Sequence, residues 1–284
     1  MSKSTAAEGE SKSASGGKAG RNLPLAIGVG VLLGALALGS LLFLKEIFVV
    51  LAVVALCIGV SEVAAGMATR GIRIMTGVLY VGAAVVAVSA FLWGAAAFVA
   101  VFTGLVFVLL LGQLTRGTDH YVRDATANVF LAAYLPLMLG FAMLTLATED
   151  GNMRIIVFIA LTVSSDIGGY FAGVLFGKHP MAPNISPKKS WEGFAGSVVF
   201  QMIIGVWLFM WLLDAPWWAG ALAGAIMAAT ATAGDFVESA IKRDLGIKDM
   251  GSLVPGHGGL MDRLDSLVPN AFVSWVLFTV LLGT

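Results

Sequence analysis

The stretch that decides the fold is residues 74–111, which read IMTGVLYVGAAVVAVSAFLWGAAAFVAVFTGLVFVLLL without a single charged side chain. A membrane-spanning helix needs about 20 consecutive apolar residues. One straight helix over this stretch would measure about 55 Å, far more than the thickness of a bilayer's apolar core. The stretch therefore predicts two successive spans, with the turn at Trp93 and Gly94.

Further apolar runs of similar length lie on both sides of this stretch. The composition agrees with a membrane protein: 58% of the residues are hydrophobic and 12% are charged, with a mean hydropathy of +0.92, whereas soluble domains contain about 25% charged residues. We expect an all-α, polytopic integral membrane protein of about nine transmembrane helices, in a single membrane-embedded domain over 23–284. The expected spans lie near 23–44, 47–66, 74–92, 94–112, 125–147, 154–176, 193–213, 217–241 and 264–284.

The remaining composition excludes several classes of protein. Residues 1–22, rich in Ser, Gly, Ala and Lys, predict a disordered tail. The apolar run that follows is too long for the h-region of a cleavable signal peptide. A formal net charge of zero argues against a nucleic-acid partner. The single cysteine, Cys57, excludes an internal disulfide bond and a zinc site built from several cysteines.

The basic residues predict the orientation in the membrane. Cytoplasmic loops carry an excess of Lys and Arg. If the N-terminus is cytoplasmic, all 17 Lys and Arg residues except Lys45 and Arg154 fall in the tail or in cytoplasmic segments. Two long polar loops, 177–192 and 242–263, then lie on the cytoplasmic face of the cell membrane, where we expect the chemistry.

Charged residues are dense in residues 234–265, GDFVESAIKRDLGIKDMGSLVPGHGGLMDRLD. Asp235, Glu238, Ser239 and Lys242 follow the spacing i, i+3, i+4 and i+7, so they share one face of a helix. A carboxylate inside a span is costly and is usually functional. The plainer alternative is that an Asp235–Lys242 or a Glu238–Lys242 pair stabilises the end of this helix.

The second part of the same stretch is a glycine-rich loop that leads into the last apolar run. Backbone amides of such a turn can bind phosphate, and Asp262 and Asp265 share one helix face. Plainer alternatives are Asp262 as a helix N-cap, an ordinary loop, and His257 without a chemical role. The candidates here are Lys248, Asp249, His257, Gly258, Gly259, Asp262, Arg263 and Asp265.

Two other places carry candidate residues. Asp166 lies inside an expected span among small residues, where it is either functional or a hydrogen-bonded packing residue. The run S-P-K-K-S-W-E-G at 186–193 precedes another span. Its adjacent lysines suit phosphate or anionic lipid headgroups, or serve only as a topology signal. The candidates in this run are Ser186, Lys188 and Lys189.

One further acid lies in the N-terminal half. Glu62 is placed near the inner end of the second expected span. Arg70 and Arg73 are its candidate partners, and the sequence suggests no role for it in chemistry.

The stretch 234–265 fits one long signature: S-x-x-K-R, four residues, K-D, and then H-G-G-x-x-D-R-x-D. Here the signature runs from Ser239 to Asp265 with every fixed position filled. On these residues the chain resembles the phosphatidate cytidylyltransferase (CDP-diacylglycerol synthase) family. The Asp166 helix and the S-P-K-K-S-W-E-G run are also similar to the family, although 168–170 reads G-G-Y where G-A-Y is expected. The motifs lie in the C-terminal half, about 160–284, and the N-terminal half matches only as apolar helices.

The resemblance implies that CTP and phosphatidate react to give CDP-diacylglycerol and pyrophosphate at the cytoplasmic membrane face. It also implies Mg²⁺ as cofactor, with room for a monovalent cation such as K⁺, and a homodimer. The residues fit this chemistry on their own terms. A lipid phosphate is already ionised, so its attack needs charge neutralisation and in-line positioning and no strong general base.

The resemblance further implies roles for the candidate residues. Carboxylates from two helices would hold the metal, and basic groups would neutralise the phosphates. The expected metal ligands are Asp235 and Asp262. The expected catalytic residues are Asp235, Lys242, Asp249, Asp262 and Asp265. The expected substrate-binding residues are Asp166, Ser186, Lys188, Lys189, Ser239, Arg243, Lys248, His257, Gly258, Gly259 and Arg263.

Rival functions predict other patterns. A CTP-dependent polyprenyl alcohol kinase and an archaeal-type ether-lipid cytidylyltransferase are near rivals, and the signature favours the phosphatidate enzyme over both. A CDP-alcohol phosphotransferase is disfavoured because D-G-x-x-A-R followed by paired Asp is not found. A transporter or channel predicts polar groups at midplane in several helices and on both faces, whereas the polar groups here gather in two loops.

Overall fold

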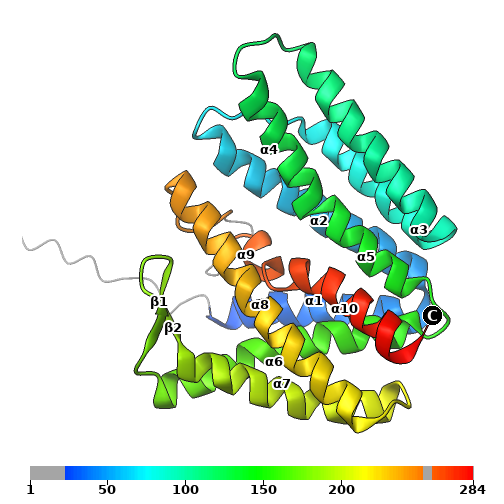
Figure 1. Cartoon of the computed structure of the whole chain (residues 1–284), viewed down its shortest axis with the longest axis vertical. Helices are drawn as coiled ribbons and strands as arrows, with labels where there is room; N and C mark the ends of the chain where they lie inside the picture. Colours follow the sequence, from blue (N-terminus) through cyan, green and yellow to red (C-terminus); the bar gives the residue numbers. More distant parts are fainter. Residues whose placement is uncertain (1–22, 252–257, 284) are drawn as a thin grey trace, which may run out of the picture.

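The computed structural model describes residues 23–251 and 258–283 as a bundle of helices with one small hairpin (Figure 1). Its elements are α1 (Leu23–Phe43), α2 (Lys45–Ala68), α3 (Thr76–Leu114), α4 (Tyr121–Tyr134), α5 (Pro136–Leu146), α6 (Gly151–Phe176), β1 (Pro180–Ala182), β2 (Ser186–Ser190), α7 (Trp191–Leu212), α8 (Trp217–Leu245), α9 (Met261–Leu264) and α10 (Leu267–Leu282).

The uncharged stretch folds as α3, which consists of two antiparallel limbs (Figure 1). The limbs meet at Gly94, whose φ of 76° and ψ of −167° are open only to glycine. The expected turn at Trp93 and Gly94 is therefore confirmed. It follows that the chain changes direction here because one residue without a side chain interrupts an otherwise continuous helical pattern.

The apolar helices confirm the all-α polytopic class. Seven helical segments among the described residues are long and apolar enough to cross a membrane. One of them is the two-limbed α3, and another, Tyr121–Leu146, combines α4 and α5 across a break at Leu135. The first helix counts only as the shorter apolar segment Gly34–Phe43. The number of nine spans stays a prediction.

Small residues let the helices of the C-terminal half approach closely. A methyl group added at Gly168 of α6 would overlap Phe200 and the backbone of Gly196 in α7. One added at Gly205 of α7 would overlap Gly220 of α8. Contacts between small residues are a common way to join helices in a membrane. This packing holds α6, α7 and α8 side by side and fixes the positions of the acids that they carry.

The segment expected to be a loop at 177–192 contains the antiparallel hairpin of β1 and β2, with Pro180 opposite Ser190 and Ala182 opposite Ser186. Glu192, at the start of α7, holds the base of this hairpin: its carboxylate accepts from the backbone N–H groups of Lys178 and His179. It also contacts Nδ1 of His179 at 2.5 Å. The hairpin is therefore a fixed platform for the residues of β2.

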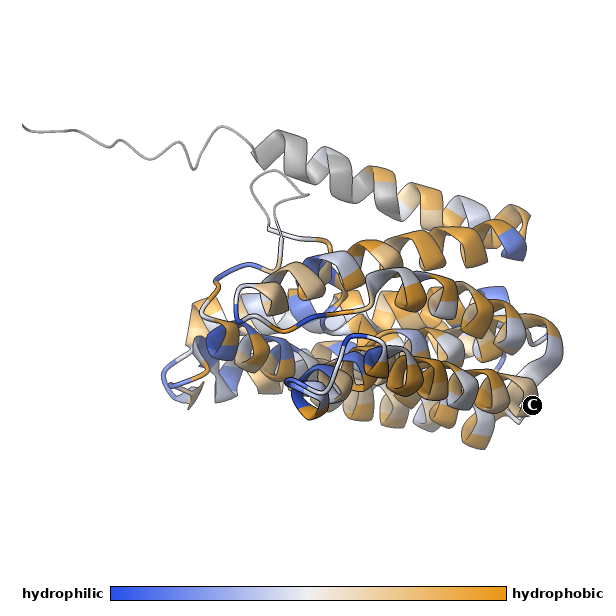
Figure 2. Cartoon of the chain, turned by 90° about the horizontal axis from the view of Figure 1, so that it is seen from above, coloured by the Kyte–Doolittle hydropathy of each residue, from blue (hydrophilic) through white to orange (hydrophobic). Residues whose placement is uncertain are grey.

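The polar residues concentrate toward one end of the helices, the end that carries the hairpin (Figure 2). At the other end, Lys45 donates to the carbonyl oxygens of Thr148 and Glu149. The buried Arg154 pairs with Asp150 at 2.7 Å. These cations therefore join turns to helices there, and the candidate chemistry lies at the opposite end.

Candidate active site

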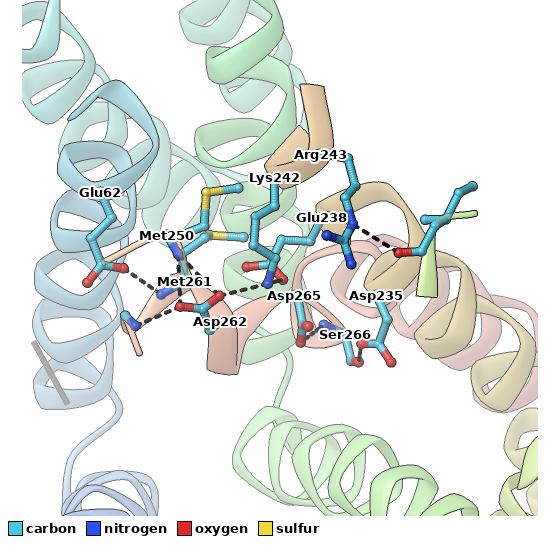
Figure 3. Close-up of polar contacts among 12 residues, drawn as sticks. Glu62, Asp235, Glu238, Lys242, Arg243, Met250, Met261, Asp262, Asp265 and Ser266 are labelled. Carbon is cyan, nitrogen blue, oxygen red and sulfur yellow. Dashed lines mark hydrogen bonds and ion pairs between the residues drawn. The ribbon is translucent and has the colours of Figure 1, made fainter. Parts of the chain in front are cut away.

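The first part of the site centres on Asp235, on the face that α8 turns toward the hairpin and α10. Oδ1 of Asp235 accepts from the hydroxyl of Ser266 at 2.5 Å (Figure 3). Its Oδ2 forms an ion pair with Nζ of Lys189, which reaches over from β2. The hairpin and α8 are thus joined through one carboxylate.

Lys189 is held among acids. Its ammonium lies 5.0 Å from the centre of the Phe236 ring. Burial lowers the pKa of Lys189 to about 8, while the charges of Asp265, Asp166 and Glu238 act in the opposite direction. The ammonium of Lys189 therefore lies among acids from α6, from α8 and from the turn between α9 and α10.

The second part of the site centres on Lys242, seven residues or about two turns further along α8. Its Nζ lies 2.5 Å from Oε2 of Glu238 and 2.7 Å from Oδ1 of Asp262 (Figure 3). The Glu238–Lys242 pair was one of the two alternatives left open by the sequence, and the structure contains it. The carboxylates of Glu238 and Asp262 are buried, so the ammonium of Lys242 neutralises their charge in place of water. The two ion pairs also link α8 to the start of α9.

The carboxylate of Asp262 also binds backbone N–H groups on both sides of the glycine-rich loop. It accepts from the backbone N–H of Gly259 at 2.6 Å and from that of Met250 at 3.1 Å. Gly258 beside it has a φ of +82°, which favours glycine. The N–H of Gly259, expected to face a phosphate, is therefore bound by a carboxylate of the chain itself.

A pocket of about 330 Å³ lies between α6, the hairpin, α7 and α8. It brings together residues expected to act jointly although they lie far apart in the sequence. The expected site residues that line it are Asp166, Ser186, Lys188, Lys189 and Asp235. The pocket therefore joins the Asp166 helix, the S-P-K-K run and Asp235 of α8, which belong to three separate motifs in the sequence.

The other expected residues that the structure describes do not line this pocket. Lys242 and Asp262 form the neighbouring cluster, and Asp265 accepts from the backbone N–H of Ser266 at 2.7 Å. Nε of Arg243 lies 3.5 Å from the carbonyl oxygen of Ile185 in the hairpin turn. Ser239 is half-buried on α8, and Lys248, Asp249 and Arg263 are exposed. His257 lies outside the described residues.

The acids and the basic groups in the two parts of the site do not balance in charge. The acids are close enough to influence the pKa values of the site; they are Asp166, Asp235, Glu238, Asp262 and Asp265. The basic groups among them are Lys189, Lys242 and Arg263. With Lys188, which lines the same pocket, five acids face four basic groups, and the formal charge is −1. A buried oxygen, Oε1 of Glu238, has no hydrogen-bond partner among the described residues. An arrangement of this kind suits a divalent cation.

The donor set fits Mg²⁺ better than a metal held by protein ligands alone. The described residues contain no group of three or more His, Cys, Asp or Glu side chains placed to hold a metal ion. Mg²⁺ usually binds through one or two carboxylates together with water and substrate phosphates. Asp235 and Asp262 are the two carboxylates that such a site would use; in this structure the first is paired with Lys189 and the second with Lys242.

The structure corrects the expected partners of Glu62. Arg70 donates to the carbonyl oxygens of Asp244 and Leu245, and Arg73 pairs with Asp124 at 3.1 Å. Neither arginine pairs with Glu62, because both reach away from α2 to other elements. A salt bridge inferred from proximity in sequence is therefore wrong here.

Glu62 instead contacts the start of α9. Its two carboxylate oxygens accept from the backbone N–H groups of Leu260 and Met261, at 3.0 and 2.8 Å. Figure 3 shows Glu62 beside Met261. Sequence reasoning missed this contact. The one signal was an acid inside an apolar run, which is usually functional. The identity of its partners was not encoded locally, since they lie almost 200 residues away.

The fold and the site together define a polytopic membrane protein with a lysine–carboxylate cluster at one end of its helices. The model of the cytidylyltransferase family matches residues 25–281 of this chain. The chain is 41% identical to a phosphatidate cytidylyltransferase of Mycobacterium leprae over 93% of this chain and 90% of that protein. It is 40% identical to a phosphatidate cytidylyltransferase of Mycobacterium tuberculosis over 93% and 84% of the two chains.

A more distant relative matches part of the chain. The phosphatidate cytidylyltransferase of Helicobacter pylori is 33% identical over 57% of this chain and 61% of that protein. The chain belongs to the phosphatidate cytidylyltransferase family, as its motifs indicated, and it is an enzyme of the nucleotidyltransferase class.

Proposed function

We propose that the chain transfers the cytidylyl group of CTP to phosphatidate, at the cytoplasmic face of the cell membrane, with Mg²⁺ as cofactor. The observation that carries this proposal is the pocket in which Lys189 of the hairpin meets Asp235 of α8. The pocket lies at the polar end of the apolar helices, where a nucleotide from water would meet a lipid headgroup from the bilayer.

The reaction replaces one phosphoanhydride bond by another. A phosphate oxygen of phosphatidate attacks the α-phosphorus of CTP and forms a new P–O–P bond. The bond between the α-phosphorus and the oxygen that bridges to the β-phosphorus breaks, and pyrophosphate leaves with that electron pair. Because the nucleophile is an oxyanion, the protein has to orient two anionic groups and neutralise their charge.

The residues of the pocket are suited to these tasks. Lys188 is exposed on β2 and free to approach phosphate oxygens, while Lys189 supplies a partly buried cation. Asp235 and Asp262 would hold Mg²⁺, which supplies charge stabilisation for the transferring phosphoryl group. Ser186 lines the same pocket as a hydrogen-bond donor. The accompanying monovalent cation and the homodimer stay predictions.

Purified protein with CTP labelled at either end tests the proposal against its near rivals. With phosphatidate as acceptor, label from the α-phosphate of CTP should enter the lipid, and label from the γ-phosphate should leave as pyrophosphate. A lipid kinase gives the reverse pattern with a polyprenyl alcohol. Transfer of the γ-label, or no transfer with phosphatidate in the presence of Mg²⁺, would overturn the proposed reaction.

Lys189→Ala should raise the KM for CTP or phosphatidate about 10-fold to 100-fold, because one charge-assisted contact to phosphate is lost. Steady-state kinetics of the purified variant measure this change. The matched control is Lys178→Ala, since Lys178 is an exposed lysine just outside the hairpin. Equal KM values for the wild type and Lys189→Ala would argue that this lysine serves only the ion pair with Asp235.

The cytoplasmic location of the site is open to a labelling test. In a Cys57→Ser background, a cysteine at exposed Lys178 should react with a membrane-impermeant thiol reagent only after cell lysis. A cysteine at exposed Glu149, at the other end of the helices, should react in intact cells. Labelling of position 178 from outside would contradict the orientation, and a cytosolic nucleotide would then have no route to the pocket.

A further inference from the structure

Glu62 connects the half of the chain that has no motifs to the half that has them. It is a buried residue of α2, and both of its carboxylate oxygens accept hydrogen bonds from the loop–helix junction at Leu260 and Met261. These two N–H groups open the single turn of α9 and have no partner within that turn. The carboxylate of Glu62 therefore takes the place that an N-cap side chain would usually take.

Two glycines make room for this contact. A methyl group added at Gly251 or at Gly259 would overlap the carboxyl group of Glu62. Any larger residue at either position would push the loop and α2 apart. The glycines at 251 and 259 therefore bring the backbone close to an acid of another helix, which is a reason for glycine that differs from phosphate binding.

Asp262 and Glu62 bind three consecutive N–H groups between them. Asp262 accepts from Gly259, and Glu62 accepts from Leu260 and Met261. Asp262 follows Met261 directly, so the backbone that Glu62 holds also sets where the carboxylate of Asp262 lies. That carboxylate is 2.7 Å from Nζ of Lys242. A shift at the start of α9 would change this distance.

We propose that Glu62 is a positioning residue of the nucleotidyl transfer. It fixes the start of α9 from α2, and so holds Asp262 in register with Lys242 and with the pocket beyond. The proposal rests on the proposed function for the role of Asp262, while the contact itself stands on the geometry alone. Residues that orient a metal-binding or reacting group typically change activity about 10-fold to 100-fold when they are replaced.

The test uses two variants of the full-length protein, Glu62→Gln and Glu62→Ala. Gln keeps one acceptor oxygen and presents an N–H₂ group to the other backbone N–H, so it should lose one of the two bonds. Ala should lose both. We expect kcat to fall about 10-fold or more in Gln and further in Ala, the Mg²⁺ concentration for half-maximal activity to rise, and KM for CTP to change less than about 3-fold.

Amide hydrogen exchange supplies a readout that does not depend on activity. Exchange at Leu260 and Met261 should become at least about 10-fold faster in Glu62→Ala, with an intermediate change in Glu62→Gln, while the middle of α10 keeps its protection. The control is Glu46→Gln, an exposed acid at the other end of α2, which should change neither readout. If Ala does not fold, Gln alone decides the outcome.

The outcomes separate the two claims. Unchanged exchange at residues 260–261, or unchanged kcat and Mg²⁺ dependence with altered exchange, would overturn the positioning role. A rise in KM for CTP alone would also overturn it, because positioning of Asp262 predicts an effect on turnover. If the wild type itself transfers no cytidylyl group, the proposed function fails, and the exchange measurement still tests whether Glu62 holds α9.

Discussion

Asp235→Asn should lower kcat about 10³-fold, and the variant should remain folded. Asn has nearly the shape of Asp and can still accept from the hydroxyl of Ser266, so the packing between α8 and α10 is retained. What it loses is the charge that faces Lys189 and the pocket. Losing a preorganised electrostatic group that acts mainly in the transition state typically costs on the order of 10²–10³ in kcat.

The measurement is transfer of α-labelled CTP to phosphatidate by the purified variant, with thermal unfolding as the folding check. Asp244→Asn is the matched control, because Asp244 is an exposed acid of the same helix whose contact with Arg70 uses only its backbone carbonyl oxygen. The control should keep wild-type turnover. Near-normal kcat in Asp235→Asn would remove this carboxylate from the catalytic centre and leave it as the partner of Lys189.

Much of the fold followed from the sequence because the spans are set by local hydropathy. The turn at Gly94 is an example: the uncharged stretch is too long for one span, and a single glycine beside Trp93 marks the place where it turns. The hairpin at 180–190 was not foreseen. Its strands are too short to show an alternating apolar pattern in the sequence. The base of the hairpin is held by Glu192, which lies outside the strands.

The sequence predicted which residues form the site better than it predicted how they pair with one another. The motifs selected Lys189, Asp235, Lys242 and Asp262 because charges are costly within or beside spans. Which acid meets which lysine depends on the way three helices and a hairpin pack, and no spacing within one motif encodes that. Glu62 is the clearest example. Its partners are backbone N–H groups, and almost every residue type has one, so the sequence does not reveal the contact.

Lys242→Met should be the most destabilising of the single changes proposed for this chain. The side chain of Lys242 is 17% exposed, and those of its partners Glu238 and Asp262 are 1% and 9% exposed. Met has a similar length and fills the same space without the charge. Two buried carboxylates would then face each other without the cation between them, and removing one partner of a buried ion pair costs about 3–5 kcal/mol.

Thermal unfolding of the purified protein in one detergent measures the effect, and the midpoint should fall by roughly 10 °C. Lys242→Arg keeps the charge and is the control, with a much smaller shift expected. Adding Glu238→Gln to Lys242→Met removes one of the stranded charges, so it should recover part of the stability. It should not recover turnover, because the cation beside Asp262 is still missing. A Lys242→Met variant as stable as the wild type, or a double variant no more stable than the single one, would contradict a structural role for this lysine and leave its charge entirely to the substrate phosphates.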